Sequence, residues 1–205
     1  MRVVLATNNV GKLRELQAML QPLGFEVLPK SQFTREEVIE DGDSFVANAL
    51  LKARHAARAS GLPAIADDSG IEVDALGGAP GIYSARYAGA QATDLDNLNK
   101  LLESMQAVPD ENRVARYRCA LVYVREAEDQ QPLICEASWE GSISRHTQGH
   151  GGFGYDPIFW LSDYGCTAAE LASDVKNRIS HRGQALQMLL QSLSAAYTST
   201  GSLLC

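Results

Sequence analysis

The chain has 205 residues, of which 45% are hydrophobic and 21% charged, and its formal net charge is −7. This length and composition are ordinary for one α/β domain, or for one domain with a small lobe. Because the sequence contains no run of Lys and Arg, we expect no binding to nucleic acid through a broad basic face. An acidic protein can still bind a nucleotide through a few local cations and a metal ion.

The cysteines and the N-terminal residues indicate the compartment. The four cysteines are scattered without Cys-x-x-Cys spacing, which predicts reduced thiols rather than a disulfide framework or a zinc site. The N-terminal stretch MRVVLATNN lacks the apolar core of a signal peptide, and no apolar run approaches ~18 residues. We therefore expect a cytoplasmic protein that does not enter a membrane.

The first third of the chain predicts short strands that alternate with helices. Residues 2–6 are an apolar run typical of a buried strand, and the polar turn TNNVGK follows it. Leucines at three- and four-residue spacing then predict an amphipathic helix over residues 13–20. Asp43 is the expected N-cap of an alanine-rich helix. Two further strands are predicted at residues 25–28 and 64–66.

The remainder of the chain predicts longer strands and two glycine-rich loops. Thr93 or Asp94 begins a helix, and residues 116–125 and 133–140 predict an antiparallel strand pair. The loops are GGAPG and GHGGFGYDP, and Ser180 is the expected cap of a final helix. The pattern predicts a mixed α/β sheet in a single domain over residues 1–195, followed by a flexible tail over residues 196–205.

The turn TNNVGK joins a strand to a helix, which places backbone N–H groups and Lys12 at a helix N-terminus. Such an arrangement is a natural binding site for phosphate. It is not a Walker A loop, because Gly-x-x-x-x-Gly-Lys-Ser/Thr is absent. The alternative is an ordinary connecting turn with a solvated lysine.

The stretch AIADDSG runs from an apolar strand into two adjacent carboxylates, Asp67 and Asp68. Two neighbouring ionised carboxylates repel each other unless a cation lies beside them or one takes up a proton. Mg²⁺ would remove the conflict, and Glu40 and Asp41 offer further acids. The alternative is a strand-end turn in which Asp67 or Ser69 bonds to backbone amides.

Two later motifs suggest a base-binding surface. In GGFGYDP, Phe153 and Tyr155 offer aromatic rings for stacking, and Asp156 offers an acceptor for a purine edge. In SHRG, His181 and Arg182 offer donors that would bond to a keto oxygen and disfavour an amino group. The alternatives are a core aromatic pair beside a turn and a surface His-Arg pair; together, the motifs favour a nucleoside triphosphate site.

Four motifs in this order, TNNVGK, ADDSGIEVDALGGAPGIYSARYAG, GGFGYDPIF and SHRGQAL, resemble the inosine triphosphate pyrophosphatase family, and especially its bacterial members that act on dITP and XTP. The resemblance covers roughly residues 2–194. It implies a mixed α/β fold whose elongated central sheet carries two lobes flanking an active-site cleft. It also implies Mg²⁺-dependent hydrolysis of ITP, dITP and XTP to the monophosphate and pyrophosphate, and a homodimer.

By the same resemblance, Asp68 is the catalytic residue and a Mg²⁺ ligand with Glu40. The residues expected to bind the substrate are Thr7, Asn8, Asn9, Val10, Gly11, Lys12, Ser69, Phe153, Gly154, Tyr155, Asp156, Lys176, His181 and Arg182.

This sequence departs from the family pattern around Gly42. The acids before the glycine are shifted by one place, so that Glu40 is the expected metal ligand and Asp41 the alternative. Ala47 stands where family members carry a glutamate in Phe-x-Glu-Asn-Ala, which leaves open a nucleotide-binding module without activity. A phosphatase with a phospho-aspartate is disfavoured, because the first strand ends in Ala6-Thr7 rather than Asp-x-Asp. Lys52 faces either the phosphates or solvent.

Overall fold

The computed structural model describes residues 1–199, with side chains up to residue 195. Of the expected tail, residues 196–199 belong to the last helix and residues 200–205 lie outside the described residues. Backbone contacts group the chain into two compact units. The first comprises Met1–Asp68, Cys119–Ala137 and Arg182–Cys205, and the second comprises Ser69–Arg118 and Ser138–His181.

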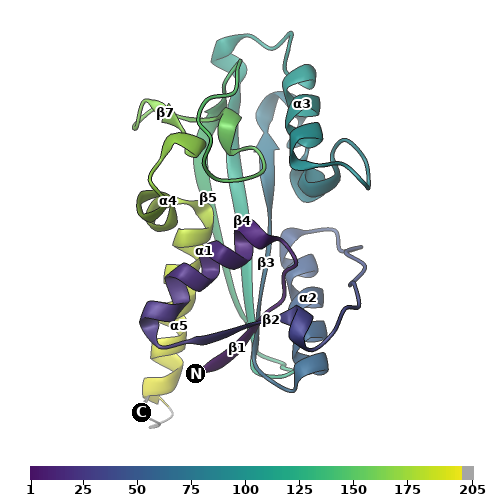
Figure 1. Cartoon of the computed structure of the whole chain (residues 1–205), viewed down its shortest axis with the longest axis vertical. Coiled ribbons are helices and arrows are strands. Elements are labelled where there is room, and N and C mark those ends of the chain that lie inside the picture. The colour runs from purple at the N-terminus through teal and green to yellow at the C-terminus, as the bar shows by residue number, and fades with distance from the viewer. Residues whose placement is uncertain (200–205) are drawn as a thin grey trace. The chain divides into compact units, whose positions relative to one another are not determined.

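The strands form a seven-stranded sheet in the order β2-β1-β3-β4-β5-β6-β7 (Figure 1). β1 pairs in parallel with β2 and β3, whereas β5–β6 and β6–β7 are antiparallel pairs, so the predicted mixed α/β class is confirmed. The strand bounds are Arg2–Leu5 (β1), Glu26–Pro29 (β2), Ala64–Val73 (β3), Val114–Val124 (β4), Leu133–Ile143 (β5), Phe159–Leu161 (β6) and Cys166–Thr167 (β7).

The helices α1, α2 and α3 begin at side-chain caps, of which the sequence predicts the one at Thr93. Asn9 caps α1 through its side-chain oxygen, which accepts the N–H of Lys12 at 3.0 Å. Thr93 caps α3 in a complete capping box. The expected cap Asp43 is wrong, because Ser44 accepts the third N–H of α2 instead. The helix bounds are Val10–Leu20 (α1), Phe45–Ser60 (α2), Asp94–Ser104 (α3), Ser173–Ile179 (α4) and His181–Ser199 (α5).

The first unit has its own core, in which α1 and α5 pack on one face of the strands and α2 lies on the other (Figure 1). Leucines from α1 and α5 meet alternate residues of β1, β3 and β4. Such alternation follows from the two-residue period of a strand. The buried members are Val3, Leu5, Leu16, Leu20, Ile65, Cys119, Leu121, Tyr123, Cys135, Ala185, Leu186, Leu189 and Leu193.

The second unit has a separate core that contains most of the buried aromatic rings. Its buried members are Ile71, Val73, Leu98, Leu101, Met105, Ala115, Tyr117, Trp139, Ile143, Tyr155, Ile158, Phe159, Leu161 and Ala168.

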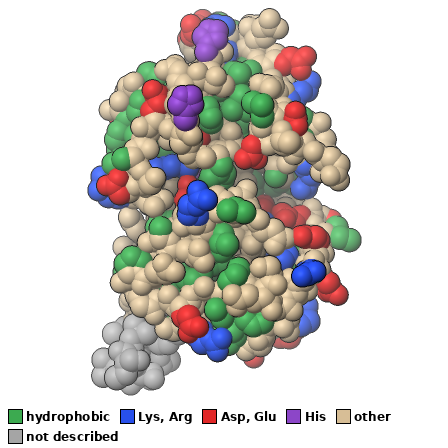
Figure 2. All heavy atoms as spheres, in the orientation of Figure 1, with side chains coloured by type: hydrophobic (Ala, Val, Ile, Leu, Met, Phe, Trp, Pro, Cys, Tyr) green, Lys and Arg blue, Asp and Glu red, His purple; other side chains and the backbone are tan. Residues whose placement is uncertain are grey.

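Two further features concern the surface charge and the helices. On the face that Figure 2 shows, Lys and Arg side chains alternate with Asp and Glu and form no continuous basic area. Among the helices of residues 1–199, none is both long enough and apolar enough to cross a membrane.

Arg113 fixes the start of β4 within the second unit. Its guanidinium is buried and donates to the carbonyls of Ile143 (2.6 Å), Met105 (2.7 Å) and Ser144 (3.1 Å), with a longer bond to Val108 (3.2 Å). Burial lowers the pKa of Arg113, but an arginine keeps its charge. The planar fork therefore ties the end of α3 and the end of β5 to β4.

We predict that Arg113→Met lowers the free energy of unfolding by about 3 kcal/mol, because buried carbonyls lose their donor. Arg113→Lys should recover only part of this, since an ammonium cannot reproduce the fork. Urea unfolding monitored by tryptophan fluorescence measures both. Arg145→Met, at an exposed ion pair with Asp110, is the control and should stay within about 1 kcal/mol of the unchanged protein.

Candidate active site

The two carboxylates of AIADDSG lie inside a strand rather than after it. β3 continues from Ala64 to Val73, so the predicted end of the strand at residue 66 is wrong. Consecutive residues of a strand point to opposite faces of a sheet. Asp67 therefore shares a face with Ile65, which packs against α1 and α5, whereas Asp68 points to the face that α2 covers.

Asp67 is completely buried and is surrounded by donors. The Nε of Arg182 donates to it at 3.0 Å, Lys12 forms an ion pair with it, and the thiol of Cys119 donates to it at 3.2 Å. Burial alone would raise the pKa of Asp67, but Arg182 and Lys12 lower it well below the usual range. Asp67 is therefore an ionised carboxylate whose charge the protein itself balances.

Asp68 meets a different cation on the other face. The Nζ of Lys52 lies 2.6 Å from Asp68 and 3.2 Å from Glu40, so one ammonium bridges both carboxylates. Burial raises the pKa of Asp68 above its ordinary value, and Lys52 and Lys12 only partly oppose this. Burial alone would lower the pKa of Lys52, but Asp68 and Glu40 raise it. The sequence left open whether Lys52 faces the phosphates or solvent. In the structure, its side chain faces the carboxylates of Asp68 and Glu40.

Asp68 and Glu40 converge on one point, whereas Asp41 is exposed. This geometry favours Glu40 over Asp41 as the second acid. Within residues 1–199, no group of three or more His, Cys, Asp or Glu side chains is arranged to hold a metal ion. An ion held by Asp68 and Glu40 would therefore need further oxygen ligands from water or from a substrate.

The turn TNNVGK is organised by its own side chains at the start of α1. The backbone N–H of Asn9 donates to Thr7 Oγ1 at 3.1 Å, and the side chain of Asn8 donates to Glu37 at 2.5 Å. Val10 and Gly11 form the first turn of α1, and Val10 is exposed. Lys12 points to Asp67 from this turn, so its ammonium lies at the carboxylate face of β3.

Asp156 holds the loop that contains GGFGYDP. Both Asp156 and Ser69 belong to the second unit. The Oδ2 atom of Asp156 accepts the N–H of Phe153 at 2.8 Å and the Nζ of Lys176 at 2.7 Å. Gly152 has a φ of +72°, and a Cβ there would lie 2.0 Å from the same oxygen, so only glycine fits. Asp156 thus orders the loop in addition to offering an acceptor.

The aromatic residues of this loop differ in exposure. Tyr155 is buried, and its hydroxyl donates to the carbonyl of Ser84 at 2.7 Å, so its ring belongs to the core. Phe153 is half-buried, and Lys176 lies 4.8 Å from its ring centre. Gly154, between them, donates its N–H to Asp94 at 3.0 Å. Phe153 remains the stacking candidate, and Lys176 is a buried cation on α4 rather than a solvated one.

His181 and Arg182 begin α5 but serve different compact units. His181 is buried, and its ring stacks on Tyr117 with centroids 4.6 Å apart. Arg182 donates to Asp67 and also to Glu15, at 2.5 Å. Sequence reasoning treated them as two donors for one base. The structure commits the guanidinium of Arg182 to carboxylates of the first unit.

Sequence reasoning missed three residues that contact the predicted site. Glu15 was detectable, because it lies one helical turn after Lys12 on α1. Cys119 and Tyr117 are alternate residues of β4, and they contact Asp67 and Asp156, respectively. Neither carries a motif, since an apolar strand looks the same whether or not its side chains touch a site.

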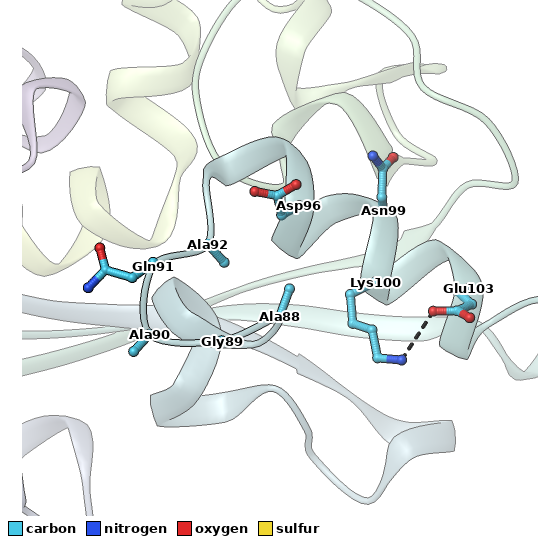
Figure 3. A pocket seen from close by; sticks show the side chains of 9 residues that line it. All are labelled: Ala88, Gly89, Ala90, Gln91, Ala92, Asp96, Asn99, Lys100 and Glu103. Atoms are coloured by element: carbon cyan, nitrogen blue, oxygen red, sulfur yellow. Dashed lines mark hydrogen bonds and ion pairs between the residues drawn. The ribbon is translucent and has the colours of Figure 1, made fainter.

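A hollow of about 850 Å³ lies beside α3 but contains none of the predicted site residues (Figure 3). Its charged side chains already have local partners, because Lys100 pairs with Glu103 at 3.1 Å and Asp96 accepts from Thr93. The hollow therefore offers little for catalysis or phosphate binding. Its lining residues are Ala88, Gly89, Ala90, Gln91, Ala92, Asp96, Asn99, Lys100 and Glu103.

Comparisons with known proteins agree over nearly the whole chain. The chain is 57% identical over 192 residues to a dITP/XTP pyrophosphatase of Escherichia coli strain K12, covering 94% of this chain and 98% of that protein. It is 55% identical over 195 residues to a dITP/XTP pyrophosphatase of Photorhabdus laumondii, covering 95% and 99%.

The solved structures lead to the same family. A HAM1 protein from Coxiella burnetii has a TM-score of 0.86 at 46% identity, covering 95% of this chain and 99% of that one. The Ham1 protein of Staphylococcus aureus has a TM-score of 0.83 at 36% identity, covering 96% and 100%. A family model described as the Ham1 family matches residues 3–192. These matches confirm the resemblance found in the motifs, and the chain belongs to the Ham1 family.

Proposed function

We propose that this chain hydrolyses the non-standard purine nucleoside triphosphates dITP, ITP and XTP to the monophosphate and pyrophosphate, and so removes them from the nucleotide pool. The relatives named dITP/XTP pyrophosphatase, at 55–57% identity over nearly the full chain, support this assignment. The observation that carries it is the pair of adjacent aspartates with different ion-pair partners: Asp67 pairs with Arg182 and Lys12, and Asp68 pairs with the Lys52 ammonium.

The proposed reaction needs a base beside a water molecule and positive charge beside the phosphates. Asp68 has a raised pKa and can accept a proton from the water that attacks the α-phosphorus. Lys12 and the N–H groups at the start of α1 balance the charge of the departing pyrophosphate. Catalysis is then mostly positioning and electrostatic stabilisation.

Mg²⁺ is part of this proposal, and the residues present fit it. Asp68 and Glu40 already share one cation, the Lys52 ammonium, and carboxylate oxygens are the ligands that Mg²⁺ prefers. Bound there, Mg²⁺ would supply charge neutralisation for the phosphate oxygens. Lys52 would then turn from the carboxylates toward the phosphates.

Base selection follows from donors in the second unit. His181 and Lys176 are buried donors, and a purine with a keto oxygen at position 6 provides an acceptor for them. Adenine places an amino group there and would leave a buried donor unpaired, at about 1–3 kcal/mol. Arg182 donates to Asp67 and Glu15. It therefore affects base selection through these carboxylates rather than as a direct donor to the base. We also propose, from the family resemblance, that the enzyme is a cytoplasmic homodimer.

We predict that Asp68→Asn lowers kcat for ITP by about 10³-fold or more while the protein stays folded, because the amide cannot accept the proton. Pyrophosphate release from ITP in the presence of Mg²⁺ measures the rate, and circular dichroism checks the fold. Asp74→Asn is the control, since this exposed carboxylate lies in the second unit and pairs there with Arg116. Near-normal turnover of Asp68→Asn would remove Asp68 from the mechanism.

We predict that Lys52→Met tightens Mg²⁺ binding to the substrate-free protein by about tenfold, because the competing ammonium is gone and both carboxylates remain. Isothermal titration calorimetry at fixed ionic strength measures the Kd. Lys100→Met, at an exposed pair with Glu103, should leave the Kd unchanged. Binding that stays the same or weakens in Lys52→Met would show that the ammonium does not occupy the place of the metal.

We predict that a panel of purine triphosphates separates ITP, dITP and XTP from ATP by about 10- to 100-fold in kcat/KM. Pyrophosphate release with and without Mg²⁺ measures each rate. Equal cleavage of ATP and ITP would reject the assigned base donors. No hydrolysis of any triphosphate, with binding retained, would favour the nucleotide-binding module without activity.

A further inference from the structure

We propose that Tyr117 is a positioning residue for base recognition, which holds the ring of His181 in one plane and the carboxylate of Asp156 in one orientation. Tyr117 lies on β4, carries no sequence motif and contacts two predicted base-binding residues. The inference rests on the proposed function, because it concerns how the same enzyme selects its substrate.

The first contact is a face-to-face stack between two rings. The rings of Tyr117 and His181 are 4.6 Å apart between centroids and only 7° from parallel. Tyr117 is itself fixed by Phe159, whose tilted ring lies 4.6 Å away, and by Trp139 at 6.3 Å. A histidine ring that lies flat on a fixed surface cannot rotate freely about its last side-chain torsion. The stack therefore sets the direction in which the ring nitrogens of His181 point.

The second contact fixes Asp156. The hydroxyl of Tyr117 donates to Oδ1 of Asp156 at 3.3 Å, while Oδ2 accepts from Phe153 and Lys176. The two oxygens thus have different donors, which together hold the carboxylate in one orientation. That carboxylate positions Lys176, which lies over the ring of Phe153. Tyr117 therefore supports both the donor and the stacking part of the base-binding residues.

This arrangement bears on selectivity more than on the chemical step. Hydrogen bonds weaken steeply when donor and acceptor are misaligned, so a keto oxygen gains from a donor in a fixed direction. If the donor has no fixed direction, its hydrogen bond to the keto oxygen of ITP is weaker. The penalty for the amino group of ATP is then smaller as well. Asp68, which carries the chemistry, lies in the first unit and forms its contacts with Lys52 and Glu40. Loss of the Tyr117 ring should therefore change KM and the substrate ratio more than kcat.

The alternative is that Tyr117 only fills the core, since it is 7% exposed and packs among buried residues. A purely structural role predicts that a smaller side chain lowers the stability and the rates for all substrates alike. Tyr123 supplies a matched control, because it is a tyrosine on the same strand, is 4% exposed and packs in the core of the first unit. The substrate ratio separates the two roles.

The test compares Tyr117→Leu, Tyr117→Phe and Tyr123→Leu in the full-length protein. We expect Tyr117→Leu to lower the ratio of kcat/KM for ITP over ATP at least tenfold, mainly through KM for ITP. Tyr117→Phe keeps the ring but loses the hydroxyl bond to Asp156, so we expect it to lower the ratio by about threefold, less than Tyr117→Leu does. Tyr123→Leu should leave the ratio unchanged even if it lowers the melting temperature. Should Tyr117→Leu not fold, Tyr117→Met replaces it, because methionine fills the volume better.

Two outcomes overturn the proposal: an unchanged ITP/ATP ratio in a folded Tyr117→Leu or Tyr117→Met variant, or a loss in Tyr117→Phe as large as in those variants. Failure of the proposed function looks different, because the unmodified protein would then hydrolyse none of the purine triphosphates. The stack is also testable without substrate. The chain has four histidines, and the imidazole proton resonances of His181 should move in Tyr117→Leu but little in Tyr117→Phe; no movement in Tyr117→Leu also overturns the proposal.

Discussion

Two consecutive carboxylates inside one buried strand are the constraint on which the rest of the site depends. Because side chains of a strand alternate between faces, Asp67 and Asp68 form their direct ion pairs with different cations. Arg182 and Lys12 hold Asp67 on the face of α1 and α5, and Lys52 holds Asp68 on the face of α2. The alternation thereby gives two chemically identical side chains different surroundings, so that the pKa of Asp67 is lowered and the pKa of Asp68 is raised.

The same alternation on β4 supplies the supporting contacts. Tyr117 and Cys119 are two residues apart and so share a face; the first contacts Asp156 and His181, and the second contacts Asp67. A strand whose side chains look like ordinary core thus contacts predicted residues in both compact units. Likewise, consecutive residues at the start of α5 serve one unit each, His181 in the second and Arg182 in the first. Each of these short stretches of chain therefore contributes residues to both units.

The sequence predicts the local elements of this site better than the contacts between residues that are far apart in the chain. The start of α3 at Thr93 and the alternation of strands and helices follow from local patterns, and the structure shows them. The length of β3 does not, since the polar residues 67–69 look like a turn until cations elsewhere in the chain balance them. The role of Arg182 depends on Asp67, 115 positions away, so no local pattern could separate a donor to a base from a partner of a buried carboxylate. Asp43 failed as a cap for a smaller reason, because the adjacent Ser44 competes for the same N–H groups.

The structure also changes the meaning of Ala47. With Ser44 as the N-cap of α2, residue 47 is the third residue of the helix, and its N–H donates to Ser44 Oγ at 3.2 Å. A glutamate at this position would complete a capping box by reaching back to the N–H of the cap. The family pattern Phe-x-Glu-Asn-Ala is therefore consistent with a helix cap as well as with a metal ligand. Alanine here removes the second half of that box, while Glu40 and Asp68 keep their shared cation. Ala47 therefore weakens the capping of α2 at its first turn. It does not alter the pair of acids on which the proposed chemistry depends.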